Sequence, residues 1–370
     1  MHLAIDGREL VAEARTGIGR YVREVLRAAS ERGWRCTVYG DARTALPETL
    51  SGIDLARLTA PGTRWWDQIA LPRALGRDGA DVFLSPYYKA PLVAPCPVVL
   101  TIHDLYFIGY GGRRRLRDAA LTRAARLYAR RARAIVTDSE HSRRAIVERL
   151  GVAAAKVTAI GVAVGAEFAP TPLRTATRAR YGVAGSYVLY VGNFMPHKNV
   201  DGLLRAWALL PATLRATHRL VLAGADTARR PPLEGLARAL DLGASVVFTG
   251  RVDDADLPAL YSACTAFVLP SLDEGFGLPA IEAMACGAPV IVSDRGALPE
   301  IAGPGALVVD VAGDEGLATA LARLLREPAQ REALRRRGRA RATDFTPART
   351  AARVLDLVES VVSATVMVTP

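Results

Sequence analysis

The segment Asp273-Glu274-Gly275-Phe276-Gly277-Leu278-Pro279-Ala280-Ile281-Glu282-Ala283-Met284-Ala285-Cys286-Gly287 lies between two apolar runs, residues 266–270 and 289–293, which have the composition of buried strands. Pro279 suits the first turn of a short helix, and Gly287 suits the position just after its end. A strand, a helix and a strand in this order form a parallel pair in an α/β sheet. Because such sheets bind ligands where their strands end, we expect a ligand site in the loop at residues 273–277.

This loop and helix offer two kinds of contact to a ligand. Gly275 and Gly277 let the backbone approach closely, and the helix N-terminus favours a phosphate. Glu274 and Glu282 have seven residues between them. Their carboxylates would repel a phosphate, so we assign them to hydroxyl groups of the ligand. A carboxylate can accept two hydrogen bonds from a vicinal diol. The pattern predicts a phosphorylated, polyhydroxylated ligand. The alternative is that Glu274 caps the helix and Glu282 makes a surface ion pair.

Apolar runs joined by helical segments occur along the whole 370-residue chain and predict two parallel sheets, each covered by helices on both faces. We expect strands at 3–5, 34–39, 82–84, 98–102, 134–137 and 157–160, and then at 187–191, 220–224, 246–249, 266–269, 290–293 and 307–310. A linker is expected at 165–180, where two prolines occur. The predicted fold class is therefore α/β, with two Rossmann-like, doubly wound domains facing across a cleft.

Segment 273–287 resembles the E-x7-E motif of the retaining GT-B glycosyltransferases of glycosyltransferase family 4. Four further segments extend the resemblance over nearly the whole chain: Asp6-Gly7-Arg8, Thr16-Gly17-Ile18-Gly19-Arg20-Tyr21, Thr101-Ile102-His103-Asp104-Leu105 and Tyr190-Val191-Gly192-Asn193-Phe194-Met195-Pro196-His197-Lys198-Asn199. The last two are most similar to a bacterial mannosyltransferase subgroup that builds O-antigen and related polysaccharides. The resemblance implies an acceptor-binding domain at 1–169, a nucleotide-sugar donor-binding domain at 170–345 and a C-terminal helix at 346–370 that crosses back to the first domain.

The resemblance also implies roles for individual residues. In the catalytic set, Glu274 contacts the donor sugar, Lys198 contacts the donor phosphate, and His103 faces one of the two sugars. The chain departs from the family pattern at Asn193, where many members have an arginine, and Arg251 or His197 is a candidate to replace that charge. The predicted donor-binding residues are Gly17, Gly19, Asn193, His197, Arg251, Gly275, Phe276, Gly277, Leu278 and Glu282, of which Glu282 contacts the ribose.

Each candidate in the N-terminal half has a structural alternative. Gly17 and Gly19 form a lone GxG, which is also typical of an ordinary turn. His103 follows a predicted strand, where a single histidine is commonly structural, and Asp104 is equally suited to a turn. The weak acceptor-binding candidates are Asp104, Tyr87 and Tyr88, with Trp65 and Trp66 as further aromatic groups for stacking on a sugar, although core packing is the commoner fate of such rings.

The net charge of +11, from 48 basic and 37 acidic residues, favours anionic partners. The densest basic segment is 111–135, in which Leu116, Ala120, Ala124 and Leu127 can share one helical face. We weigh two interpretations of it: an amphipathic helix that touches an anionic membrane, and an ordinary solvated helix packed on the sheet. We expect no nucleic-acid partner.

The first residues contain an apolar stretch too short for a signal peptide, so we expect a cytoplasmic protein, with the inner face of the membrane as a candidate peripheral location. The four cysteines form no CxxC pair and are expected to be reduced core residues. Asp254-Ala255-Asp256 spells the DxD signature of metal-dependent transferases of another fold, but it precedes a predicted helix, whose start favours acidic residues without a metal. We expect neither a metal nor a cofactor.

Together these features predict a retaining glycosyltransferase that moves a hexose, mannose from GDP-mannose, onto a glycan or lipid-linked glycan hydroxyl in polysaccharide synthesis. Three alternatives stay open: a transferase that uses a UDP-sugar, a sugar-nucleotide epimerase on the same fold, and a non-enzymatic binder of membranes or nucleic acid. The sequence does not fix the donor base and sugar, the acceptor and linkage, or the oligomeric state.

Overall fold

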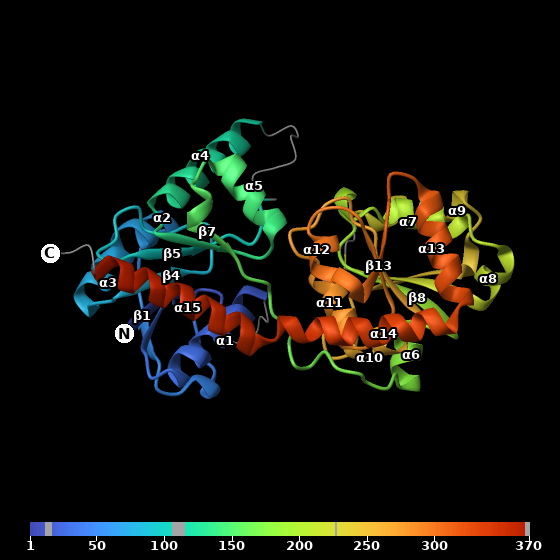
Figure 1. Cartoon of the computed structure of the whole chain (residues 1–370), viewed down its shortest axis with the longest axis horizontal. Helices are drawn as coiled ribbons and strands as arrows, with labels where there is room; N and C mark the ends of the chain where they lie inside the picture. Colours follow the sequence, from blue (N-terminus) through green and yellow to red (C-terminus); the bar gives the residue numbers. More distant parts are fainter. Residues whose placement is uncertain (12–16, 106–114, 226–227, 367–370) are drawn as a thin grey trace. The chain divides into compact units, whose positions relative to one another are not determined.

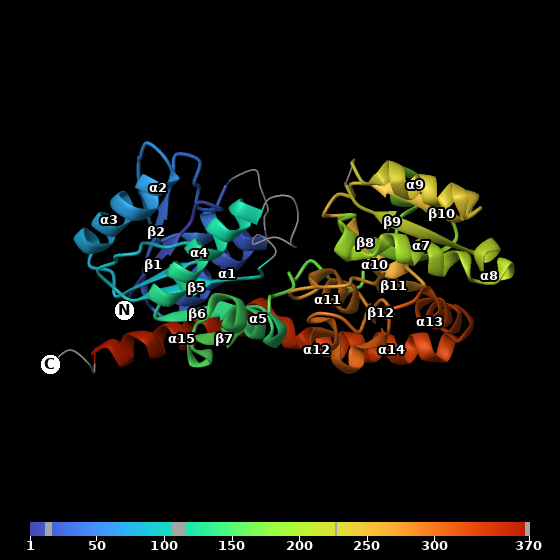
Figure 2. The ribbon, with the colours of Figure 1, turned by 90° about the horizontal axis from the view of Figure 1, so that it is seen from above.

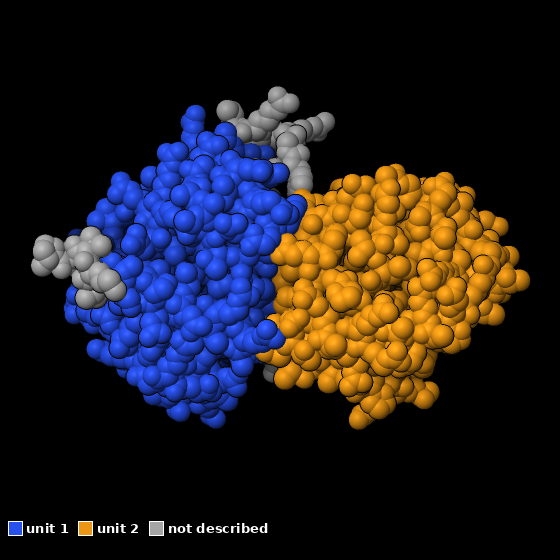
Figure 3. All heavy atoms as spheres, viewed as in Figure 1, with its two compact units in different colours: residues 1–163, 347–370 blue, residues 164–346 orange. Residues whose placement is uncertain are grey.

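The structure is a computed structural model, and the residues it describes are 1–11, 17–105, 115–225 and 228–366 (Figure 1). They divide into two compact units (Figure 3): unit 1 comprises Met1–Ala163 with Pro347–Pro370, and unit 2 comprises Val164–Thr346. From the sequence we placed these divisions at 169/170 and 345/346. The stretch 165–180, expected as a linker, belongs to unit 2 and contains the short helix α6 (Thr175–Arg180).

Unit 1 contains seven parallel strands in the order β3-β2-β1-β4-β5-β6-β7. The strands are β1 (His2–Asp6), β2 (Arg35–Gly40), β3 (Asp54–Arg57), β4 (Val82–Ser85), β5 (Val98–Thr101), β6 (Ala134–Thr137) and β7 (Val157–Ala159). One face packs on α1 (Gly17–Glu31) and α15 (Pro347–Val366). The other face packs on α3 (Leu71–Asp78), α4 (Arg115–Arg131) and α5 (Glu140–Leu150), and α2 (Thr63–Trp65) with a π-helical turn, Trp66–Ala70, precedes α3 (Figure 2).

The central strands β1, β4, β5 and β6 are buried at every position because both faces of the sheet are covered. In β1, Leu3 and Ile5 point to the cluster of α1 and α15, whereas Ala4 points to the cluster of α3, α4 and α5. This alternation is the two-residue period of a strand. Strand β3 was not predicted, since Leu55 is its only large apolar residue and the strand lies half-buried at the sheet edge.

Unit 2 contains six parallel strands in the order β10-β9-β8-β11-β12-β13. These are β8 (Ser186–Val191), β9 (His218–Ala223), β10 (Val246–Gly250), β11 (Ala266–Leu269), β12 (Val290–Ser293) and β13 (Ala306–Val309), and all six were predicted. The helices are α7 (Val200–Ala208), α8 (Ala212–Thr217), α9 (Arg230–Ala239), α10 (Leu257–Ala263), α11 (Leu278–Ala285), α12 (Leu298–Ala302), α13 (Asp314–Arg326) and α14 (Pro328–Ala342). Helix α11 packs against α10 and α14, while α7 packs against α9 and α13.

Two features that would indicate another class of protein, a membrane-crossing helix and a metal site, are absent from the described ranges. No helix there is long and apolar enough to cross a bilayer, and no three His, Cys, Asp or Glu side chains gather in a way that could hold a metal ion. The four cysteines are unpaired, and three of them are buried.

Helix α15 should be essential to the stability of unit 1. Leu355 is fully buried in the cluster that α15 shares with α1 and β1, so Leu355→Ala should lower the free energy of unfolding by about 2–5 kcal/mol. Urea titration followed by circular dichroism measures this change. The exposed Ser363→Ala on the same helix is the control and should alter stability by less than about 0.5 kcal/mol. Equal unfolding midpoints for the two variants would contradict the expectation.

Candidate active site

The loops that follow β8 and β11 lie side by side at the carboxyl edge of the unit 2 sheet. β8 and β11 are hydrogen-bonded neighbours, with β9 and β10 beyond β8, and β12 and β13 beyond β11. The backbone N–H of Leu272 donates to the carbonyl of His197 at 2.7 Å, and the Asn199 amide donates to the carbonyl of Pro270 at 3.2 Å. The chain order thus reverses at the place where open α/β sheets bind ligands, and it brings segments 193–199 and 270–277 together.

Glu274 and Lys198, predicted in these two segments, form an ion pair. The Lys198 ammonium donates to Glu274 Oε1 at 2.6 Å, and their side chains are only 7 % (Glu274) and 15 % (Lys198) exposed. The hydroxyl of Ser271 donates to the same oxygen at 2.8 Å. Within the described ranges the second oxygen, Oε2, has no hydrogen-bond partner and is not enclosed. One oxygen is therefore saturated, and the other can accept a hydrogen bond from a ligand hydroxyl.

A buried frame behind the loop holds Glu274 in place. Ser271 and Ser293 are fully buried, and the Ser293 hydroxyl donates to the Ser271 carbonyl. The backbone N–H of Ala297 donates to the Glu274 carbonyl at 2.9 Å. Gly296 has φ of +62°, and a Cβ on it would lie 2.5 Å from the Glu274 nitrogen, so only glycine fits against this stretch.

The ion pair changes the expectation for Lys198, which was predicted to contact a phosphate. Removing one partner of a buried pair leaves an uncompensated charge and costs about 3–5 kcal/mol. An anion that binds Lys198 must therefore share it with Glu274, whereas a hydroxyl can reach Glu274 Oε2 without breaking the pair. The geometry suits a ligand with both groups, in which the anion lies on the Lys198 side and the hydroxyl on the Oε2 side.

The residues between Glu274 and α11 determine the conformation of the loop. Gly277 has φ of +89° at the start of α11, and a Cβ on it would collide with Leu298. Phe276 is buried, with its ring edge-on to Phe345 at 5.4 Å between centroids. Gly275 and Leu278 are half-buried. Of this predicted donor-binding group, Phe276 is committed to the core and has only its backbone to offer a ligand.

Glu282, one turn into α11, lies against a tyrosine that the sequence did not single out. The Tyr261 hydroxyl from α10 donates to Glu282 Oε2 at 3.1 Å, and both side chains are buried. Burial, together with the charge of Glu282, raises the pKa of Tyr261 well above its ordinary value, so the phenol stays protonated and remains a donor. Tyr261 therefore fixes the orientation of the second carboxylate of the motif.

A cavity of about 580 Å³ opens at the carboxyl ends of β8, β9 and β10. It contains the predicted residues Asn193 and Arg251 and adds Asp254 and Gly224. A Cβ on Gly224 would collide with the Gly192 carbonyl and lie 3.0 Å from the Phe194 ring, so the glycine is needed where these strand ends meet. The full lining is Val191, Gly192, Asn193, Met195, Ala223, Gly224, Ala225, Arg251, Val252, Asp254 and Leu257.

Asp256 occupies the N-cap position of α10, as the helix-start interpretation of this segment expected, whereas Asp254 lies two residues before it. Asp256 precedes α10 but makes no side-chain cap hydrogen bond, because its carboxylate accepts from the Tyr181 hydroxyl at 2.9 Å. Asp254 belongs to the lining of the cavity. The intervening residue separates the two carboxylates, so that one is structural and the other is available to a ligand.

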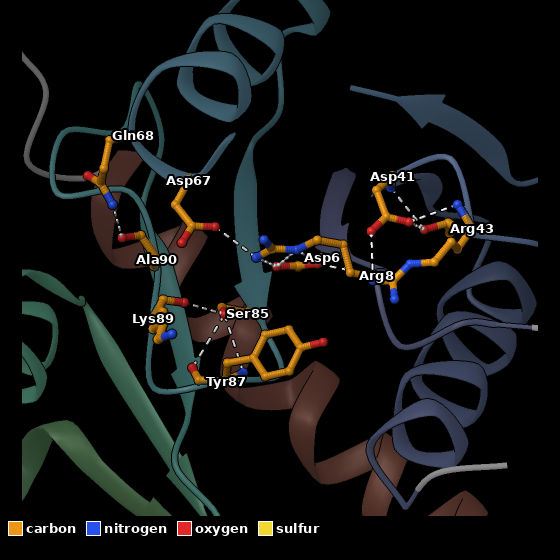
Figure 4. Close-up of polar contacts among 11 residues, drawn as sticks. Asp6, Arg8, Asp41, Arg43, Asp67, Gln68, Ser85, Tyr87, Lys89 and Ala90 are labelled. Atoms are coloured by element: carbon orange, nitrogen blue, oxygen red, sulfur yellow. Dashed lines mark hydrogen bonds and ion pairs between the residues drawn. The ribbon is translucent and has the colours of Figure 1, made fainter. Parts of the chain in front are cut away.

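In unit 1, the carboxyl ends of β1 and β4 carry a buried charged cluster (Figure 4). The Arg8 guanidinium donates to Asp6 at 2.6 Å and to Asp67 at 2.8 Å, and it stacks 3.8 Å from the centroid of the Trp66 ring. Burial raises the pKa of Asp6 even though Arg8 opposes this change. Because two carboxylates share one guanidinium, the cluster ties the end of β1 to the π-helical turn and gives this edge a fixed shape.

The aromatic acceptor-binding candidates differ in their exposure and in their position relative to this cluster. Tyr87 is half-buried beside Arg8, with 5.9 Å from its ring centroid to the guanidinium carbon. Tyr88 packs partly against the core, and Trp66 is buried beneath Arg8. Trp65 is 60 % exposed. Tyr87 and Trp65 are thus positioned to meet a ligand, whereas Trp66 follows the core alternative.

His103 follows β5 and pairs with a buried carboxylate that the sequence did not reveal as a site residue. Its Nδ1 lies 3.0 Å and 3.1 Å from the two oxygens of Asp138, which follows β6. Asp104 is half-buried next to it. Gly17 and Gly19 lie in the first turn of α1, with open space beside Gly17, while Thr16 lies outside the described residues.

The described part of α4 packs on the sheet, as one of the two interpretations expected, and gives the membrane contact weighed beside it no support. Ala125 and Ala129 are the residues it buries in the core, and Leu127 is 44 % exposed. Residues 111–114 of the basic segment lie outside the described ranges. The apolar face expected through Leu127 is therefore not the face that packs on the sheet.

The chain matches two family models, one in each half. Residues 15–167 match Glycosyltransferase Family 4, and residues 180–341 match Glycosyl transferases group 1. The first match lies mostly in unit 1 and the second lies within unit 2. Together the matches take in the loops that carry His103, Lys198 and Glu274.

Among curated proteins, the chain is 34 % identical over 218 residues to the O-antigen chain mannosyltransferase B of Escherichia coli, covering 58 % of this chain and 57 % of that protein. It is 34 % identical over 224 residues to the serotype-specific mannosyltransferase WbdA of Escherichia coli, covering 56 % of this chain and 27 % of that protein. It is also 35 % identical over 244 residues to a D-inositol 3-phosphate glycosyltransferase of Kineococcus radiotolerans, covering 60 % and 56 %. The matched region thus spans about half, or less, of the length of these relatives.

Solved structures resemble the chain over almost its whole length. Sucrose-phosphate synthase from Thermosynechococcus elongatus is 24 % identical with a TM-score of 0.76, covering 98 % of this chain and 100 % of that chain. HepE of Anabaena, solved with UDP-glucose, is 20 % identical with a TM-score of 0.72, covering 97 % and 99 %. These likenesses confirm the predicted GT-B fold of two Rossmann-like domains. The chain thus carries a Glycosyltransferase Family 4 domain in its first half and a Glycosyl transferases group 1 domain in its second half.

Proposed function

We propose that this glycosyltransferase transfers mannose from GDP-mannose, with retention of configuration and without a metal ion, to a hydroxyl of a glycan or lipid-linked glycan in bacterial polysaccharide synthesis. The observation that carries the donor choice is the acidic residue Asp254 in the lining of the cavity at the carboxyl ends of β8, β9 and β10. The names of the mannosyltransferase relatives support the choice of sugar.

Asp254 favours guanine over the other bases. A carboxylate only accepts hydrogen bonds, and guanine presents two adjacent donors, N1–H and the 2-amino group, on one edge. Uracil and thymine present a single N–H between two carbonyl oxygens, which a carboxylate would repel. Adenine presents its amino group beside a ring nitrogen that is an acceptor. A UDP-sugar is the alternative donor, and it requires that the base contact the backbone of this cavity and avoid Asp254.

The neighbouring residues suit the remainder of the donor. The Lys198 ammonium and the N-terminus of α11 offer positive charge to a diphosphate, and Arg251 lines the cavity where Asn193 leaves no charge. Glu274 Oε2 is positioned to accept from a sugar hydroxyl, and Glu282 is assigned to the ribose. As the family resemblance implies, the donor phosphate would take the acceptor proton, and the enzyme would contribute positioning and charge stabilisation.

A nucleotide panel tests the base. In thermal-shift measurements GDP-mannose should stabilise the protein more than UDP-, dTDP- or ADP-sugars. Asp254→Asn should weaken GDP-mannose binding about tenfold or more, because hydrogen bonds to a charged group are worth about 1.5–3 kcal/mol.

The matched control is Asp253→Asn, since Asp253 pairs with Arg180 at 2.7 Å and does not line the cavity. This variant should keep the wild-type preference. A larger shift with a UDP-sugar than with GDP-mannose, or equal GDP-mannose affinity in both variants, would rule out the guanine assignment.

Glu274 should be required for transfer. Glu274→Gln removes the charge that pairs with Lys198 and should lower kcat by about 100-fold or more, as loss of a transition-state electrostatic contact does. Glu327→Gln, an exposed change at the end of α13, is the control and should keep wild-type turnover. The assay separates the product by chromatography: a new glycosidic bond indicates transfer, and an isomerised nucleotide sugar would indicate the epimerase alternative. Near-wild-type transfer by Glu274→Gln would exclude this site.

A further inference from the structure

The register of the unit 1 sheet places His103 and Asp138 directly beside each other. β5 and β6 are parallel, with Leu100 opposite Ile135 and Thr101 opposite Val136. The backbone N–H of Ile102 donates to the Val136 carbonyl at 2.8 Å and extends the ladder by one residue. The next residue of each strand then leaves the sheet at its carboxyl edge. The contact between the two side chains is therefore set by residues that closely follow two neighbouring paired strands.

The Asp138 carboxylate determines where His103 carries its proton. Both carboxylate oxygens lie within 3.1 Å of Nδ1, and a carboxylate can only accept. Nδ1 must therefore be the donor, whether the ring is neutral or charged. In the neutral ring Nε2 is then an acceptor, and in the charged ring it becomes a second donor. Nε2 has no hydrogen-bond partner in the described part of the chain and is enclosed, although the side chain as a whole is 27 % exposed.

Both groups would be costly to bury without a function. Asp138 is 8 % exposed, and His103 is the one hydrogen-bond partner of its carboxylate among the described residues. An enclosed nitrogen without a partner costs about 1–3 kcal/mol. A ligand oxygen that reaches Nε2 would remove that cost.

We propose that Asp138 is a positioning residue: it holds His103 in the Nδ1–H tautomer, so that Nε2 is the atom presented to the bound sugar. The contribution to transfer rests on the proposed function, whereas the tautomer and the titration of the ring do not. Loss of the Asp138 carboxylate should therefore change the tautomer and the titration of the His103 ring while the fold is kept.

The charged and titratable groups around the ring support this assignment. Burial by itself lowers the pKa of His103, but the charge and hydrogen bond of Asp138 and the charge of Asp104 outweigh it, so the pKa is raised. From α1, the ring of Tyr21 lies edge-on to His103 at 5.9 Å, and its hydroxyl is within 3.2 Å of Thr101 Oγ1. Burial raises the pKa of Tyr21, which therefore stays neutral. Asp138 is the group that both contacts the ring and carries charge.

NMR of the unliganded protein tests the proposal directly. His103 is one of five histidines and is identified by the signal that disappears in His103→Gln. In the wild type, nitrogen shifts should show the Nδ1–H tautomer of the neutral ring. In Asp138→Asn that preference should be lost, and the pKa of His103 should fall by about 1 unit or more, because an opposite charge at this distance shifts a pKa by about 1–3 units.

Asp104→Asn is the matched control for the NMR titration, since it removes a nearby charge that does not bond Nδ1. It should lower the pKa of His103 less and leave the tautomer unchanged. An unchanged tautomer and pKa in Asp138→Asn would overturn the proposal. So would an Asp104→Asn variant that behaves like Asp138→Asn.

The pH dependence of transfer then tests the role in the reaction. The limb of the pH–rate profile that His103 governs should move to lower pH in Asp138→Asn. The displacement should equal the change in pKa that NMR measures, whether the reaction uses the charged or the neutral ring. A changed NMR titration with an unmoved pH profile would show that Asp138 does not act on transfer. Absence of transfer by the wild type would refute the proposed function, and the NMR result would still decide the tautomer.

Discussion

Parallel pairing of all strands is the constraint on which the rest of this molecule depends. Every strand of both sheets runs in the same direction as its neighbours, so each sheet must be covered on both faces, and every strand ends at the same edge. The loops after β8, β10 and β11 therefore meet in unit 2, and those after β1, β4, β5 and β6 meet in unit 1. Residues far apart in sequence become neighbours there without any specific long-range interaction to direct them.

At these edges the polar side chains are held by other side chains that are themselves largely buried. Glu274 is fixed by Lys198 and Ser271 and supported by the close approach of Gly296. His103 is fixed by Asp138. In both cases one atom of the functional group is used for positioning, and the other is left to a ligand.

The sequence allowed most of the fold to be predicted, because apolar runs such as 187–191 and 290–293 have no other interpretation in a chain of this composition. Strand β3 was missed because an edge strand buries too little to have an apolar pattern. The Lys198–Glu274 pair was not predicted, although both residues were, since their contact depends on β11 pairing with β8, which the sequence does not state. Asp138 and Tyr261 lie in no motif, and each has a role only because it positions the side chain that it contacts. Asp254 was assigned to a cap because spacing alone cannot tell which of two nearby carboxylates lines the cavity.

The division of the chain has a consequence for biosynthesis. Unit 2 is continuous, but unit 1 needs α15, whose Val354, Leu355 and Val358 fill the same cluster as Val22 and Leu26 of α1. During translation, one face of the first sheet therefore has no complete cover until the ribosome has made residues 347–366. Unit 2 can fold first, reversing the usual order in which the N-terminal domain leads. The nascent chain thus carries an apolar sheet face through the synthesis of all of unit 2, and this interval is when it is most exposed to aggregation and most in need of a chaperone.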